Sequence, residues 1–87
     1  MKYSIQWVDA TLKENWEELR KSDKNIKYTL DNEASDGWME FTAEHTFTAT
    51  NDRNAKNYAQ NYEFGWRDIE IWSLYKGNEV IMTEEDL

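Results

Sequence analysis

Near the N-terminus, the spacing of apolar residues changes from every second position to every third or fourth. The alternating apolar residues, typical of a strand with one buried face, are Tyr3, Ile5 and Trp7. The apolar residues that then recur at i, i+4 and i+7, as on one side of a helix, are Leu12, Trp16 and Leu19. Thr11 and Glu14 have the spacing of a capping box, which predicts that Thr11 is the N-cap of this helix.

The middle of the chain alternates again, in two runs separated by the turn-like sequence "NEASDG". In the first run, the inward residues are Ile26, Tyr28 and Leu30. In the second run, the inward residues are Met39, Phe41, Ala43, His45, Phe47 and Ala49. The outward residues of the second run are Trp38, Glu40, Thr42, Glu44, Thr46 and Thr48. Because this run is about twice the usual strand length of about five to six residues, we expect a bend or bulge near Glu44–His45.

A second helix and a closing hairpin complete the pattern. Either Asn51 or Asp52 can cap the helix, and Gly65 is expected to end it. The apolar stripe of this helix consists of Ala55, Tyr58, Ala59 and Tyr62. The segments "RDIEIWSLY" and "EVIMT" are expected to pair as strands across the turn "KGN".

The resulting order, β-α-β-β-α-β-β, predicts an α+β fold. The segments "SIQWVDATLKENW" and "TFTATNDRNAKNY" each have the pattern of a strand, a short polar link and a helix, which favours a ferredoxin-like arrangement with an extra strand. An α+β layout with another strand order is the alternative. In both, two helices cover one face of a mainly antiparallel sheet and leave the other face open. We expect one domain, 1–87, with an acidic and frayed tail at 83–87.

The chain of 87 residues has a net charge of −8, and this charge is unevenly distributed. Residues 28–52 contain six acidic residues and no basic one, whereas residues 1–27 are close to neutral. Direct binding to nucleic acid needs cations that face the phosphates, so the charge distribution argues against it. The acidity can also serve only to keep a small protein in solution, and this interpretation stays open.

No motif indicates an enzyme, a cofactor or a metal site, and we expect none of the three. The chain contains no cysteine, no phosphate-binding glycine loop, no serine elbow and no paired-histidine motif. His45, the single histidine, lies on the inward side of its strand and is expected to be structural. The segment "DNEASDGWMEFT" has the acidic spacing of a calcium loop, but its glycine and its last residue, Thr42, do not fit. Without a signal peptide or a membrane-spanning run, we expect a soluble, cytoplasmic protein.

The candidate functional residues belong to the open face of the predicted sheet. Alternation in "RDIEIWSLY" is expected to turn Ile69, Ile71 and Ser73 inward. The same alternation turns Asp68, Glu70, Trp72 and Leu74 outward. The candidate partner-binding residues are therefore Trp38, Glu40, Glu44, Asp68, Glu70 and Trp72.

Two properties of these residues suggest a function. Alternate residues of a strand are about 6.6 Å apart, close to the phosphate spacing of a nucleic-acid strand, so the face could present carboxylates where a nuclease expects phosphates. Exposed tryptophans often supply much of the binding energy at protein interfaces. The alternative is a solvated face whose tryptophans pack on threonine side chains.

In size, acidity, lack of cysteine and proline, and mixed α/β order, the chain resembles small accessory proteins of bacteriophages and mobile elements. This group includes anti-CRISPR proteins, restriction inhibitors and other host-takeover proteins, many of which bind a basic nucleic-acid groove. The resemblance covers the whole chain in general character and assigns no functional residue. It implies a non-enzymatic inhibitor in the host cytoplasm that docks its acidic, Trp-bearing face on a basic protein surface, such as that of a nuclease or CRISPR effector.

Two other functions stay open. The first is an interaction module that forms a homodimer through its sheet face or an edge strand, with acidity serving solubility only. The second is a small-molecule site between sheet and helices, which needs a pocket that so small a core can hardly provide.

Overall fold

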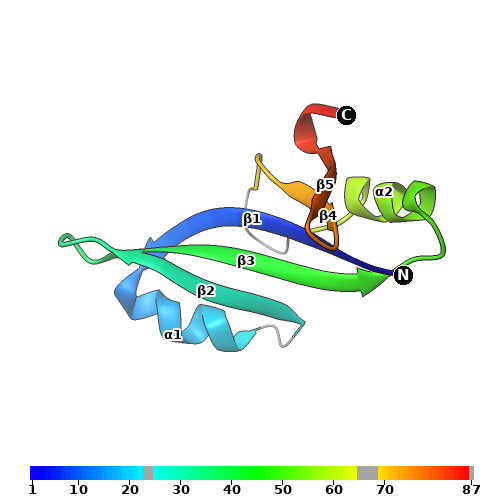
Figure 1. Ribbon diagram of the computed structural model, residues 1–87. Coiled ribbons are helices and arrows are strands. Elements are labelled where there is room, and N and C mark those ends of the chain that lie inside the picture. The colour runs from blue at the N-terminus through cyan, green and yellow to red at the C-terminus, as the bar shows by residue number, and fades with distance from the viewer. Residues whose placement is uncertain (23–24, 65–68, 87) are drawn as a thin grey trace.

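The structure, a computed structural model, describes residues 1–22, 25–64 and 69–86 and has the predicted α+β order (Figure 1). Its elements are β1 (Lys2–Leu12), α1 (Lys13–Ser22), β2 (Ile26–Glu33), β3 (Trp38–Thr48), α2 (Asp52–Gln60), β4 (Ser73–Lys76), β5 (Glu79–Thr83) and the short 3-10 helix η1 (Glu84–Asp86). Among the described residues, no helix is long and apolar enough to cross a membrane.

The five strands form one antiparallel sheet in the order β2-β3-β1-β4-β5. Each helix connects two parallel strands that have a third, antiparallel strand between them: α1 links β1 to β2 around β3, and α2 links β3 to β4 around β1. This is the split βαβ topology of the ferredoxin-like arrangement. The extra strand β5 pairs with β4 at the outer edge of the sheet.

The two longest strands, β1 and β3, pair along their whole length. Eleven consecutive pairs join them, from Lys2 with Thr48 to Leu12 with Trp38. The bulge that was expected near Glu44–His45 is therefore wrong, because β1 matches the length of β3. The irregularity in the pairing of β3 lies instead in the edge strand β2, where Asp31 is the extra residue between Leu30 and Asn32.

Helix α1 begins later than the capping-box pattern predicts. Thr11 is not its N-cap, because Thr11 pairs with Met39 in the sheet and is only 7% exposed. The helix begins at Lys13, whose backbone N–H donates to the carbonyl of Gly37 at 2.9 Å. Of its predicted apolar stripe, Trp16 and Leu19 are buried, and the Trp16 ring lies 5.3 Å from the ring of Phe41. Leu12 was wrongly assigned to this stripe, because it is the last residue of β1.

Helix α2 begins as predicted and ends early. Asn51 is the N-cap, and its side chain accepts a hydrogen bond from the backbone of Asn54 at 2.9 Å. The backbone N–H groups of Asn61 and Tyr62 donate to carbonyls three residues earlier, which tightens the last turn and ends the helix at Gln60. The expected end at Gly65 is thus wrong by several residues, and Gly65 itself lies outside the described residues.

Both helices pack on the same face of the sheet, as predicted, because Trp16 of α1 contacts Phe41 and Tyr58 of α2 contacts Phe47, which are both on the inward side of β3. The helices lie at opposite ends of the long strands (Figure 1). The buried residues of the helices are Trp16, Leu19, Ala55 and Ala59. The buried strand residues on that face include Tyr3, Ile5, Trp7, Met39, Phe41 and Ala43. The two buried alanines bring α2 close to the core, while Tyr58 and Tyr62 stack on His45. The opposite face of the sheet carries neither helix.

Candidate protein-binding surface

We call the helix-free side of the sheet the open face. Its central part is formed by the outward side chains of β1 and β3, which the register places in opposite pairs. From one end to the other, these pairs are Trp38 and Leu12, Glu40 and Ala10, Thr42 and Val8, Glu44 and Gln6, Thr46 and Ser4, and Thr48 and Lys2. The outward residues of β3 are those that the sequence predicts, because Met39, Phe41 and Ala43, which alternate with them, are all buried.

Three carboxylates follow β3 on the open face, and we call them the carboxylate row: Glu40, Asp31 and Glu44. Glu40 and Glu44 are four residues apart in the strand, which corresponds to about 13 Å. Thr42 lies midway between them on β3, and Asp31 of the neighbouring strand β2 lies beside Thr42, because its Oδ2 accepts a hydrogen bond from Oγ1 of Thr42 at 2.6 Å. Glu40 and Glu44 are thus each about 6–7 Å along β3 from the residue that Asp31 contacts.

Hydrogen bonds hold the end of the row at Glu44 in place. The side-chain amide of Gln6 donates to Oε2 of Glu44 at 3.1 Å, and the hydroxyl of Thr46 donates to Oε1 at 3.3 Å. Both donors are neutral, so neither brings a positive charge to Glu44. The open face is not purely acidic, however, because Lys27 of β2 lies opposite Glu44 and Lys2 lies opposite Thr48.

Sequence analysis did not include Asp31 among the candidate residues. The signal that could have found it is the alternation of the first run, because inward Ile26, Tyr28 and Leu30 turn Asp31 outward. The bulge in β2 then pairs Asn32 with Glu40, so Asp31 lies beside Thr42 instead of opposite Glu40.

Trp38 lies on the open face, as predicted, and is 44% exposed. It is the first residue of β3, directly after the turn that contains Gly37, whose φ of +90° suits a residue without a side chain. Its partner in the sheet, Leu12, is 36% exposed, so the two form an apolar end of the open face next to Glu40.

The prediction for the segment before β4 is wrong in its orientation. Leu74 pairs with Ile5, so it points to the helix side and is fully buried, and Trp72 is only 5% exposed. Conversely, Ile71 is 72% exposed, and Ser73 lies opposite Gln6 on the open face. Ile69 does pack against the core, as predicted. Because residues 69–72 are not part of a strand, however, the alternation does not continue from Ile69 into β4, and Trp72 and Leu74 are buried in place of Ile71 and Ser73.

The structure therefore brings together three of the six predicted residues. Trp38, Glu40 and Glu44 share the open face. Trp72 belongs to the core, and Glu70 is exposed but precedes β4, outside the sheet. Asp68 lies outside the described residues.

The open face also has a shallow hollow of about 410 Å³ beside the carboxylate row. It forms where β4 stops pairing with β1, because their ladder extends only from Tyr3 to Gln6. The hollow is lined on the open face by Gln6, Val8, Thr42, Ile71, Ser73 and Tyr75, and the buried Trp7 and Trp72 also contribute. Val8 and Ile71 are each more than 70% exposed, so the hollow has an apolar rim.

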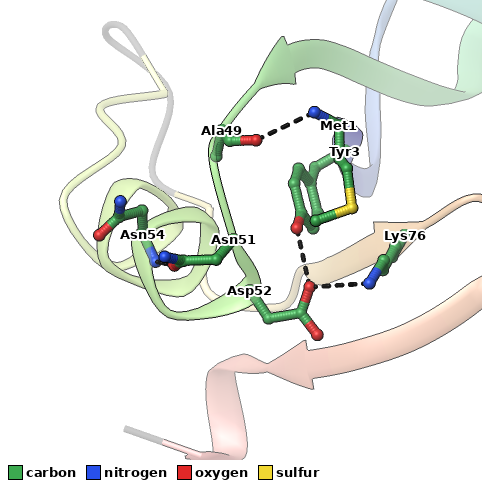
Figure 2. A network of polar contacts seen from close by, with 7 residues as sticks. All are labelled: Met1, Tyr3, Ala49, Asn51, Asp52, Asn54 and Lys76. Carbon is green, nitrogen blue, oxygen red and sulfur yellow. Dashed lines mark hydrogen bonds and ion pairs between the residues drawn. The ribbon is translucent and has the colours of Figure 1, made fainter.

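A polar network at the other end of the sheet is structural (Figure 2). Asp52 of α2 accepts a hydrogen bond from the hydroxyl of Tyr3 at 2.7 Å and pairs with Nζ of Lys76 at 3.1 Å. The bond from Tyr3 and the pairing with Lys76 lower the pKa of Asp52. Burial, and secondarily Asp52, raises the pKa of Tyr3. Both groups therefore keep one protonation state near neutral pH, and the network ties α2 to β1 and β4.

His45 lies on the helix side of β3, as predicted, and is half-buried. Its Nε2 is 2.7 Å from the hydroxyl of Tyr58, its Nδ1 is 3.3 Å from the carbonyl of Asn25, and its ring stacks on Tyr62 at 4.7 Å. These contacts give it a packing role. In the described part of the chain, no group of three or more acidic, histidine or cysteine side chains could hold a metal ion.

Comparison of the chain with models of protein families, with curated proteins and with solved structures gives no match. The function is therefore inferred from the residues and their geometry.

Proposed function

We propose that this protein is a non-enzymatic inhibitor that docks its open face on a basic, nucleic-acid-binding site of another protein and occludes that site. The observation that carries the proposal is the carboxylate row, which follows the positions of Glu40, Thr42 and Glu44 on β3; these positions repeat about every 6–7 Å, close to the spacing of phosphates along a nucleic-acid strand. A protein that binds nucleic acid places its cations to match such a spacing.

Charge and apolar surface have separate roles in this docking. The net charge of −8 attracts a basic partner over a distance and accelerates association. Trp38 and Leu12, at the end of the row, offer apolar contact area that slows dissociation. No chemical step is needed, because the bound protein blocks access of DNA or RNA.

The alternative is a homodimer through the open face, and one observation favours it. Lys2 and Lys27 lie on the same face as the carboxylates, so two copies could place opposite charges against each other. Pairing through the edge strand β2 is disfavoured by its bulge and by its charged residues Lys27, Asp31 and Glu33, which are features that block edge-to-edge association.

Displacement of a labelled oligonucleotide from purified nucleases and CRISPR effectors tests the proposal. A triple variant, Asp31→Asn, Glu40→Gln and Glu44→Gln, neutralises the row. A control variant, Glu18→Gln, Glu79→Gln and Glu85→Gln, removes the same charge at exposed positions elsewhere. We expect the wild type to displace nucleic acid from at least one target, the row variant to be at least tenfold weaker and the control variant to stay close to wild type. Equal weakening by both variants would contradict a role for the row.

A further inference from the structure

The open face places the carboxylate row directly beside the apolar hollow. Two residues contact both features. Thr42 donates to Asp31 and lines the hollow, and Gln6 donates to Glu44 and lines it as well. The row follows β3 and the hollow lies over β1 and the start of β4, so they are one to two strand spacings apart, about 5–10 Å.

The hollow has a different chemistry from the row. Val8 and Ile71 on its rim are the two most exposed large apolar side chains of the described residues, at 71% and 72%. Exposed aliphatic groups next to a hollow are typical of surfaces that contact other molecules. A sugar–phosphate backbone has no apolar group that such a hollow would have to match, so mimicry of nucleic acid alone does not account for it.

We infer that the partner recognised by the open face presents an apolar side chain between two cations that are about 13 Å apart. This inference rests on the proposed function. The cations contact Glu40 and Glu44, and the apolar side chain enters the hollow between Val8 and Ile71. The row determines how fast the partner binds, and the hollow selects among basic partners by slowing the dissociation of those that fill it.

Charge complementarity favours this occupant over a second copy of the chain. A second copy seated by the same face would bring its own three carboxylates toward the row and its own apolar rim toward the hollow. It would supply only Lys2 and Lys27 against them. A partner with a basic surface satisfies both features at once.

Two synthetic peptides, blocked at both ends, test the pattern. The peptide GKSLSKG places two lysines and a leucine on one side when extended, with the lysines about 13 Å apart. The peptide GKSSSKG has the same charge and lacks the apolar side chain. Titration of the ¹⁵N-labelled protein, followed by NMR, gives the affinity for each peptide and the residues that it contacts.

We expect the leucine peptide to bind at least fivefold more tightly than the serine peptide, since it buries apolar surface. Its shift changes should include the amides of Val8, Thr42 and Ile71. The preference should disappear in the variant Val8→Ser, Ile71→Ser, while the affinity for the serine peptide stays unchanged. Val80→Ser, an exposed position that does not line the hollow, is the matched control and should keep the preference. Because Val8 and Ile71 are so exposed, their substitution should not impair folding.

Each other outcome contradicts the role of the hollow, the proposed function, or both. Equal affinity for both peptides, with shift changes along the carboxylate row, would overturn the role of the hollow and leave the proposed function standing. A preference for leucine that survives in Val8→Ser, Ile71→Ser would also overturn that role. Binding elsewhere on the protein, or no binding of either peptide, would overturn both.

Discussion

Individual tryptophan residues have different roles in this protein, although their sequence surroundings look alike. Trp7, Trp16 and Trp72 are at most 6% exposed, whereas Trp38 is 44% exposed. Trp38 begins a strand with perfect alternation, so its outward position could be predicted from the sequence. Trp72 follows Ile71 directly in a segment that is not a strand, and two adjacent apolar residues do not tell which of them is buried. Burial of Trp72 removes more apolar surface from water than burial of the smaller Ile71 would, which favours the observed arrangement.

Substitution of the two tryptophans separates stability from binding. Trp72→Ala should reduce the free energy of unfolding by about 3–5 kcal/mol, because it leaves a cavity in the core. Trp38→Ala should cost less than about 1 kcal/mol, because the ring is half-exposed, but should weaken binding to a partner. Urea denaturation followed by circular dichroism measures the free energy of unfolding of both variants. Similar stability losses in the two variants would contradict this assignment.

The Asp52 carboxylate makes stability depend on pH. Its pKa is lowered in the folded state, so its contribution is present above the pKa of the unfolded chain, about 3.9 for aspartate, and is lost as pH falls through the folded-state value. We expect Asp52→Asn to lower the melting temperature by a constant amount from pH 7 to about pH 4. Below that, the difference from wild type should shrink. Glu18→Gln, at an exposed position, is the control. A difference that does not change between pH 5 and pH 2 would contradict the role of Asp52.

At the scale of elements, alternation and helical spacing predicted which elements exist better than where they end. The hairpin from β2 to β3 and the faces of β3 follow the sequence pattern, because the largely apolar side of β3 must be buried. Three details depended on contacts that the local sequence does not contain. Thr11 joins the sheet because Met39 is available to pair with it, the bulge lies at the free edge of β2, and α2 ends at Gln60 by tightening its last turn.

The N-cap of α2, Asn51, can be tested by comparison with Asn57, another asparagine of the same region. Asn51→Ala removes the acceptor for the backbone of Asn54 and should cost about 1 kcal/mol in unfolding free energy. Asn57→Ala changes an exposed position inside the helix, where alanine has the higher helix propensity, and should be neutral or slightly stabilising. Equal denaturation midpoints for the two variants would contradict the assignment of Asn51 as the N-cap.

At the scale of the whole molecule, the topology accounts for the free surface. Both connecting helices pack on one side of the sheet, so the other side is left to solvent or to a partner. The fold class and the open side could be predicted from the order of the elements. The composition of the face could be predicted only in part. The place of Asp31 beside Thr42 depends on a bulge, and the exposure of Val8 and Ile71 depends on the short ladder between β1 and β4.

The oligomeric state follows from the same surface. We expect sedimentation equilibrium to give a monomer at micromolar concentration, because face-to-face copies would bring two carboxylate rows together and the β2 edge is irregular and charged. A dimer that dissociates in the Trp38→Ala variant would instead support the homodimer.

The central claim is that charge on the open face is arranged for a basic partner. The most direct test is the salt dependence of the association rate constant for a target identified by displacement, measured by stopped-flow fluorescence. We predict that the rate constant of the wild type falls steeply with salt. It should become much less salt-dependent when Asp31, Glu40 and Glu44 are neutralised, and should keep its dependence when Glu18, Glu79 and Glu85 are neutralised. The same salt dependence in both triple variants would show that only net charge matters and would contradict the claim.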